Sequence, residues 1–227
     1  MEQQQQADNV LCLFYWKIRG LGAYIQLAFE AAGVTNYQFV GYTEDNEDAW
    51  FKRDKPSLTM TLPNLPYLDD GELQISEHDA IFRHVLRKYK PELLGRTLEE
   101  QAEVDQFISF WMKTNGYLRE FCYVKENPTD EDRKQQIARF DYQLSRIDAR
   151  LSSRKFHTGD NLTGADLYLY ETFQVMKMIS PSVATQYPNI NKASDAVEEL
   201  DWFKAYRASP RWFTQFNGDE AYINNKQ

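Results

Sequence analysis

The sequence predicts a small α/β domain followed by an all-helical domain, and three observations support this fold class. The first part alternates strand-like and helix-like segments and contains a hairpin turn at Asp70-Gly71. After Leu98 the apolar residues recur at helical spacing. A chain of 227 residues is long for one domain and suits two. We expect a disordered leader over 1–9, an α/β domain over 10–90, a linker over 91–97 and a helical domain with a C-terminal tail over 98–227.

Four short segments of the first domain have strand character, and a helix lies between the first two. From Leu21 onward the apolar residues Ile25 and Phe29 recur at helical spacing. Gly33 follows at the place where a helix C-cap belongs. We expect the strands over 10–15, 37–42, 67–69 and 72–75.

A second helix follows the hairpin and closes this domain. Ser76 and Asp79 form a capping-box pattern, in which the two side chains and the first helical amides bond one another. Ile81 and Val85 lie on one face of the helix, and Pro91 ends it.

The second domain contains two long helical stripes and one sharply defined helix start. The stripes cover 104–122 and 137–151, where apolar residues repeat at helical spacing. Thr163 and Asp166 form a second capping-box pattern, which predicts that a helix begins after Thr163.

Charge and cysteine content exclude several classes of function. The net charge of −8 argues against a nucleic-acid partner, because phosphate binding relies on clustered lysine and arginine. The two cysteines, Cys12 and Cys122, exclude a disulfide framework and fit a reducing compartment. No segment has the apolar length that a membrane span needs. The polar, glutamine-rich start lacks a targeting signal, so we expect a cytoplasmic protein.

The tetrad Pro63-Asn64-Leu65-Pro66 is the most informative short segment. A proline just before a strand removes a backbone donor and fixes φ, and a cis bond there would turn the chain sharply. We expect the backbone of Leu65 to stay unpaired beside a cleft, where an extended peptide can bind along it.

Several segments in this order resemble the glutathione transferases, and especially their mu class. The resemblance is carried by Leu13–Leu21 (LFYWKIRGL), Pro63–Leu68 (PNLPYL), Thr163-x-x-Asp166 and Tyr187–Ile190. It covers the chain from residue 11 to about residue 215. It implies a thioredoxin-like, glutathione-binding first domain and the family's helical second domain.

The resemblance places the catalytic hydroxyl on Tyr15, at the end of the first strand. A free thiol has a pKa of about 8.5, and its thiolate is the nucleophile. A hydroxyl that donates a hydrogen bond to the sulfur favours the thiolate. The resemblance therefore implies that glutathione is the co-substrate, that Tyr15 activates its thiol, and that no metal is needed.

The same resemblance implies a glutathione-binding wall and a contact to the second substrate. The glutathione contacts would come from Trp16, Leu21, Trp50 and Lys55 at the glycine end, from Asn64, Leu65 and Pro66 beside the cysteinyl unit, and from Glu77 and His78 at the γ-glutamyl end. Tyr123, on the long helix, would face the electrophile.

Four features depart from the mu-class pattern. His78 stands where that class has a hydroxyl residue, and Lys113 stands where it has an aspartate that reaches across the dimer. Leu62 replaces the aromatic residue that locks the dimer, and the loop before Trp50 is short. These changes weaken the expected γ-glutamyl contacts and the dimer contact.

Other reaction classes lack the residues they need. A thioredoxin-type reductase needs Cys-x-x-Cys, whereas Cys12 stands alone within a strand. An omega-like transferase needs a cysteine after that strand, and residues 17–20 contain none. His78, His84 and His157 do not have the spacing of a metal ligand set.

We therefore expect a detoxifying glutathione transferase that conjugates the glutathione thiolate to a small apolar electrophile. A homodimer, or a subunit of a larger complex, is the expected assembly. Two alternatives stay open. One is a catalytically weak or inactive protein that uses the fold as a structural or interaction subunit. The other is a glutathione-dependent isomerase that uses the same Tyr15.

Overall fold

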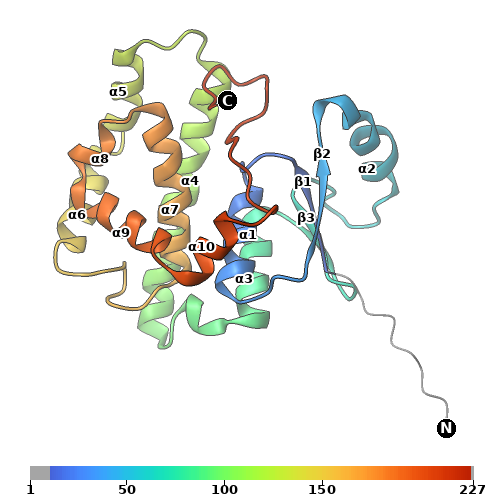
Figure 1. Cartoon of the computed structure of the whole chain (residues 1–227), viewed down its shortest axis with the longest axis horizontal. Coiled ribbons are helices and arrows are strands. Elements are labelled where there is room, and N and C mark those ends of the chain that lie inside the picture. Colours follow the sequence, from blue (N-terminus) through green and yellow to red (C-terminus); the bar gives the residue numbers. More distant parts are fainter. Residues whose placement is uncertain (1–10, 226–227) are drawn as a thin grey trace.

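The computed structural model describes residues 11–225 and shows a small sheet unit beside a larger group of helices (Figure 1). Helices α1 (Gly22–Ala31) and α3 (His78–Tyr89) lie between the sheet and the helical unit. This arrangement is the α/β plus all-α fold that the sequence predicts. We keep the domain limits of 10–90 and 98–227 as a proposal, and the leader over 1–9 lies outside the described residues.

The sheet has the strand order β2-β1-β3-β4. Strand β1 pairs in parallel with β2 and antiparallel with β3, and β3 pairs antiparallel with β4. The strands are β1 (Cys12–Trp16), β2 (Gln38–Tyr42), β3 (Tyr67–Asp69) and β4 (Gln74–Ser76). Because β1 is a central strand, its last residues and the loop that follows lie near the middle of the sheet, at the end where β1 finishes.

Helix α1 is buried along its whole length, since it packs between the sheet and the helical unit. Its C-cap is Ala32, and Gly33 follows with a φ of +78°, the left-handed conformation that a helix end favours in glycine. The sequence prediction for this helix end is confirmed.

The capping box predicted for α3 is wrong. The N-cap is Glu77, which has a φ of 68° and makes no side-chain cap bond. Ser76 instead donates its hydroxyl to the carbonyl oxygen of Leu62 at 2.5 Å, and Asp79 pairs with Arg83 at 3.2 Å. The reason is that Ser76 is the last residue of β4, so its side chain serves the neighbouring loop.

Short elements connect the sheet unit with the helices. They are η1 (Glu44–Asn46), η2 (Ala49–Asp54) and α2 (Lys55–Ser57) between β2 and β3, and η3 (Pro91–Leu94) before the helical unit. The helical unit consists of α4 (Leu98–Val124), α5 (Asp130–Ala138), α6 (Asp141–Leu151), α7 (Gly164–Ile179), α8 (Val183–Gln186), α9 (Pro188–Glu198) and α10 (Asp201–Arg207).

The capping box at the start of α7 is confirmed, and it is part of a larger buried network. The Asp166 carboxylate accepts from the amide and hydroxyl of Thr163 at 2.8 and 2.9 Å. It also lies 2.8 Å from the His157 Nδ1, while Trp111 donates its indole N–H to the Nε2 of His157 at 3.0 Å. Because Nε2 accepts, the proton of the neutral ring lies on Nδ1 and is donated to Asp166.

The C-terminal segment (residues 208–225) returns to the sheet unit after α10 (Figure 1). The amides of Arg19 and Gly20, in the loop after β1, donate to the carbonyl oxygens of Gln215 and Phe216 at 2.8 and 3.0 Å. The loop after β1 is therefore fixed by residues nearly 200 positions later in the chain.

Candidate active site

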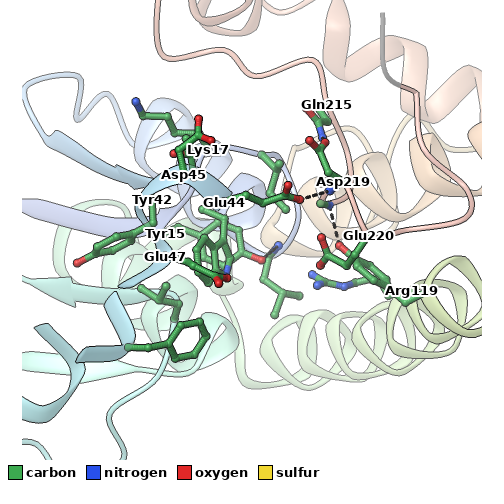
Figure 2. Close-up of a pocket in the computed structure, with 18 residues that line it drawn as sticks. Tyr15, Lys17, Tyr42, Glu44, Asp45, Glu47, Arg119, Gln215, Asp219 and Glu220 are labelled. Carbon is green, nitrogen blue, oxygen red and sulfur yellow. Dashed lines mark hydrogen bonds between the residues drawn. The ribbon is translucent and has the colours of Figure 1, made fainter. Parts of the chain in front are cut away.

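A cavity of about 670 Å³ lies where the two units meet the C-terminal segment (Figure 2). Its wall comes from the end of β1 and the loop after it, from residues 42–51, from Leu65, from α4 and from residues 215–220. These segments are far apart in the sequence, and only the folded chain brings them together.

Tyr15 lies at the base of this cavity, and its side chain is 2% exposed. The backbone N–H of Leu21 donates to the Tyr15 hydroxyl oxygen at 2.9 Å. A phenol oxygen that accepts this bond keeps its own proton available for another acceptor. The geometry thus leaves a hydroxyl donor at the cavity, as an activating group requires.

Arg119 is the feature of the site that the sequence analysis missed. It lies on α4 and lines the cavity with Tyr15 and Tyr123 (Figure 2). Its Nη1 is sealed from water and has no hydrogen-bond partner among residues 11–225. Burial lowers the pKa of Arg119, but the adjacent Tyr15 and Tyr123 phenols raise it, and the net shift is upward. Arg119 therefore stays charged.

A simple pattern points to Arg119 in hindsight. It precedes Tyr123 by four residues, and residues at this spacing share a helix face. The guanidinium carbon lies 6.0 Å from the centre of the Tyr123 ring. A tyrosine expected to face the second substrate thus predicts that this arginine faces it too.

Tyr123 links the cavity to the C-terminal segment. Its hydroxyl accepts a hydrogen bond from the amide of Gly218 at 2.8 Å, and burial raises its pKa. The Asp219 amide donates to Glu44 at 3.1 Å, and the Tyr222 amide donates to the Cys122 carbonyl at 2.9 Å. These bonds hold residues 218–222 along one side of the cavity.

Five of the residues proposed from the sequence lie together in the cavity wall, and six do not. Those in the wall are Tyr15, Trp16, Leu21, Leu65 and Tyr123. Those outside it are Trp50, Lys55, Asn64, Pro66, Glu77 and His78.

Trp50 and Lys55 lie close to each other and do not line the cavity. Trp50 is 2% exposed and packs against Tyr42 and Tyr67, with ring centres 5.6 and 6.0 Å away. The Lys55 ammonium lies 5.9 Å from the centre of the Trp50 ring. The wall instead contains the neighbouring Phe51, which is 51% exposed.

The segment before β3 has the turn that the prolines suggested. The Leu65–Pro66 peptide bond is cis, and both residues are buried. Asn64 and Glu77 are exposed. Leu65 is therefore the member of the tetrad that reaches the cavity.

His78 faces aromatic rings at the start of α3. Its ring centre lies 5.7 Å from that of Tyr24 and 6.2 Å from that of Tyr168. Burial lowers the pKa of His78 to about 4. The imidazole is therefore neutral at pH 7.

Leu62, expected to weaken the dimer contact, and Lys113, expected to weaken a γ-glutamyl contact across the dimer, are both open to solvent in the chain. Leu62 is 65% exposed, and Lys113 is exposed on α4. The homodimer stays a prediction.

No helix in residues 11–225 is both long and apolar enough to cross a membrane. Within the same range, no group of three or more His, Cys, Asp or Glu side chains is arranged to hold a metal ion.

Comparisons with known proteins match both units. Residues 12–87 match the family model described as "Glutathione S-transferase, N-terminal domain", and residues 114–210 match "Glutathione S-transferase, C-terminal domain". "Glutathione S-transferase Mu 6" of Mus musculus is 31% identical over 205 residues, which cover 88% of this chain and 91% of that protein. "Glutathione S-transferase class-mu 26 kDa isozyme 51" of Fasciola hepatica is 29% identical over 219 residues, which cover 92% of this chain and 97% of that protein.

Solved structures share the fold. The structure titled "Crystal structure of the gluthatione S-transferase Blo t 8" superposes with a TM-score of 0.79 at 20% identity, over 93% of this chain and 99% of the other. "Structure of NaGST-2" superposes with a TM-score of 0.71 at 25% identity, over 88% of this chain and 97% of the other.

Proposed function

Because this chain belongs to the glutathione S-transferase family, we propose that it conjugates the glutathione thiolate to a small apolar electrophile in the cavity beside Tyr15. Membership of the family makes the chain a transferase with glutathione as co-substrate. What we propose beyond family membership is the kind of electrophile and the role of each residue in the cavity.

The hydrogen bond from the Leu21 amide to the Tyr15 oxygen is the observation that carries the proposal. It fixes the phenol at the cavity and leaves the phenol proton to be donated. A glutathione sulfur placed there would accept this proton in a hydrogen bond, and its thiolate form would be favoured. The thiolate then attacks an electrophilic carbon, and the carbon–sulfur bond forms as the leaving group departs with its electron pair.

Glutathione would lie against the sheet unit. Leu65 would offer its backbone to the cysteinyl unit, since it reaches the cavity just before β3. Trp16, at the end of β1, and Leu21, in the loop after it, would contact the tripeptide. The glycine end would point toward Lys55, and the γ-glutamyl end toward Glu77 and the amino end of α3, where backbone amides favour an anion.

The electrophile would occupy the side of the cavity that α4 and the C-terminal segment form. Tyr123 supplies a phenol held by Gly218 on that side, and Ile18 and Phe51 face the cavity with apolar surface from the sheet unit. A cavity of about 670 Å³ falls in the range of small-molecule sites.

Replacing Tyr15 by phenylalanine tests the proposal. A hydrogen bond to a charged group contributes about 1.5–3 kcal/mol, so Tyr15→Phe is expected to lower kcat/KM at pH 6.5 about 10- to 100-fold. The loss should shrink above pH 9, where the free thiol, with a pKa of about 8.5, ionises without help. Initial rates with 1-chloro-2,4-dinitrobenzene between pH 6 and 9.5 measure both effects.

Tyr142→Phe is the matched control, because Tyr142 is 71% exposed on α6 and does not line the cavity. Its pH profile should equal that of the wild type. A Tyr15→Phe enzyme with an unchanged rate at every pH would show that another group activates the thiol.

His78 gives the structural-subunit hypothesis its specific support. A neutral ring that packs on Tyr24 and Tyr168 is a poor substitute for a hydroxyl at the γ-glutamyl end. Calorimetric titration with glutathione distinguishes the two hypotheses. Binding with a dissociation constant from micromolar to low millimolar supports the transferase. No binding by the wild type, restored by His78→Ser, would support a fold retained for assembly.

A further inference from the structure

Arg119 brings a positive charge to the cavity beside the Tyr15 phenol, and its Nη1 is an N–H donor without a hydrogen-bond partner among residues 11–225. Tyr15 already provides the hydroxyl for the sulfur. The guanidinium lies in the cavity wall with Tyr15 (Figure 2), and it forms no ion pair with any other residue in 11–225. A guanidinium in this position is costly unless something pairs with it.

The other charges of the wall differ from Arg119 in their exposure. Among the described residues that line the cavity, Lys17 is the second cation, and it is exposed. The lining carboxylates are also exposed, on the rim formed by residues 44–47 and by residues 219–220. Solvent and salt reduce the electrostatic effect of these rim carboxylates on Arg119, since the screening length is about 8–10 Å at physiological ionic strength.

The Glu44 carboxylate on that rim already has a partner. It accepts the amide of Asp219 at 3.1 Å, which ties the rim loop to the C-terminal segment. Glu220 lines the cavity as well, but it makes no ion pair with Arg119 within the 11–225 range. Arg119 thus interacts with the phenols of Tyr15 and Tyr123, but no carboxylate among residues 11–225 forms an ion pair with it, and its Nη1 has no hydrogen-bond partner there.

We propose that Arg119 selects electrophiles that carry a carboxylate or another anionic oxygen group. This inference rests on the proposed function and names the class of its second substrate. An arginine fork matches a carboxylate with two parallel hydrogen bonds, and such charge-assisted pairs are stronger than neutral ones. The apolar body of the substrate would lie on Ile18 and Phe51, with its anionic group toward α4.

The matched substrates are 4-chloro-3,5-dinitrobenzoate and its methyl ester, which differ in one negative charge. In each, the thiolate sulfur bonds to the ring carbon and chloride leaves with the bonding electrons, while the thiol proton goes to solvent. The wild type should prefer the acid. In Arg119→Met, the ratio of kcat/KM for the acid to that for the ester should fall about tenfold or more.

Binding without turnover separates this inference from the proposed function. The analogues 3,5-dinitrobenzoate and methyl 3,5-dinitrobenzoate lack the chloride leaving group and are titrated calorimetrically into the glutathione-bound protein. Tighter binding of the acid by the wild type, lost in Arg119→Met, supports the anion site even if no electrophile is turned over. Turnover of both chlorides with no preference for the acid would leave the transferase standing and overturn the anion site.

Arg146→Met is the matched control, because Arg146 is exposed on α6 and does not line the cavity. It removes one positive charge and should leave unchanged the ratio of kcat/KM for the acid to that for the ester, and the preference for the acid in binding.

Thermal unfolding of Arg119→Met without ligand gives a second check. Because Arg119 forms no ion pair among residues 11–225, Arg119→Met leaves no carboxylate unpaired and should melt close to the wild-type temperature. Equal losses for acid and ester together with a lower melting temperature would make Arg119 a structural residue.

Discussion

At the scale of single residues, two glycines decide where the Tyr15 ring can lie. A Cβ at Gly20 would come within 2.6 Å of the Tyr15 hydroxyl, and one at Gly22 within 2.6 Å of its Cδ1. Gly20 also has a φ of +41°, which disfavours other residues. The Ile-Arg-Gly-Leu segment therefore matters for the space it leaves around Tyr15 as much as for its side chains.

Gly22→Ala tests this role of backbone space. The added methyl group must displace a buried ring, so we expect a loss of about 1–3 kcal/mol in the free energy of unfolding. The displaced phenol should also lower kcat/KM at pH 6.5, because its bond from the Leu21 amide would be disturbed. Urea unfolding and initial rates measure the two effects.

Gly116→Ala is the matched control within α4. A Cβ there meets nothing within 4 Å, so the change should stabilise the protein by about 0.5–1 kcal/mol and leave the rate unchanged. If Gly22→Ala changed the free energy of unfolding and kcat/KM no more than Gly116→Ala does, the close contact of Gly22 with Tyr15 would not matter for stability or activity.

At the scale of elements, two capping boxes of the same design differ in what surrounds them. Asp132 caps α5 on the surface, where it accepts from the amide and hydroxyl of Thr129 at 2.9 and 2.7 Å. Asp166 caps α7 inside the protein and is 1% exposed. It also accepts from the backbone N–H of His157 at 2.8 Å.

Burial should make the two caps unequal in energy. Asp166→Ala leaves several buried donors unpaired, at about 1–3 kcal/mol each, so we expect a loss of at least about 3 kcal/mol in the free energy of unfolding. Asp132→Ala exposes its donors to water, and its loss should be clearly smaller. Urea unfolding of the two variants side by side is the measurement, and equal losses would contradict the role given to burial.

At the scale of the whole molecule, one buried ion pair joins the loop of the active site to the helical unit. The Arg19 guanidinium pairs with the Glu171 carboxylate on α7, and the two residues are 6% and 1% exposed. Arg19 also lies over the rings of Trp212 and Phe216, at 4.4 and 4.3 Å. Burial lowers the pKa of Arg19, but Glu171 raises it, and the net shift is strongly upward.

Removing one partner of this pair should destabilise the whole chain. Arg19→Met leaves the Glu171 carboxylate buried without its cation, and we expect a loss of about 3–5 kcal/mol. Glu171→Met should lose a similar amount. The double variant should lose less than the sum of the two, because neither charge is then left alone. A double-mutant cycle by urea unfolding measures the difference, and strictly additive losses would rule out direct coupling.

Local patterns predicted most elements correctly because their causes lie within a few residues. Apolar spacing predicted the strands and α4, and the Thr163-x-x-Asp166 pattern predicted the start of α7. The stripe over 137–151 is instead divided between α5 and α6, because the chain leaves the helix at Arg139 and Phe140. The same reasoning failed at Ser76, because a tertiary contact to Leu62 competes for its hydroxyl. Proposed site residues reach the cavity at the end of β1, as Trp16 does, and two positions before β3, as Leu65 does.

The sequence by itself determined the order of the elements, the two-unit fold and the place of Tyr15 at the end of β1, since these depend on residue spacing and on a family motif. Only the tertiary structure decided what surrounds Tyr15. Arg119 on α4 and Gly218 in the C-terminal segment meet at the cavity because long-range contacts fold their segments onto the sheet unit. A charge without an ion-pair partner is visible only when every neighbour is placed, and for this reason the proposal of an anion-selective site rests on the structure and not on the sequence.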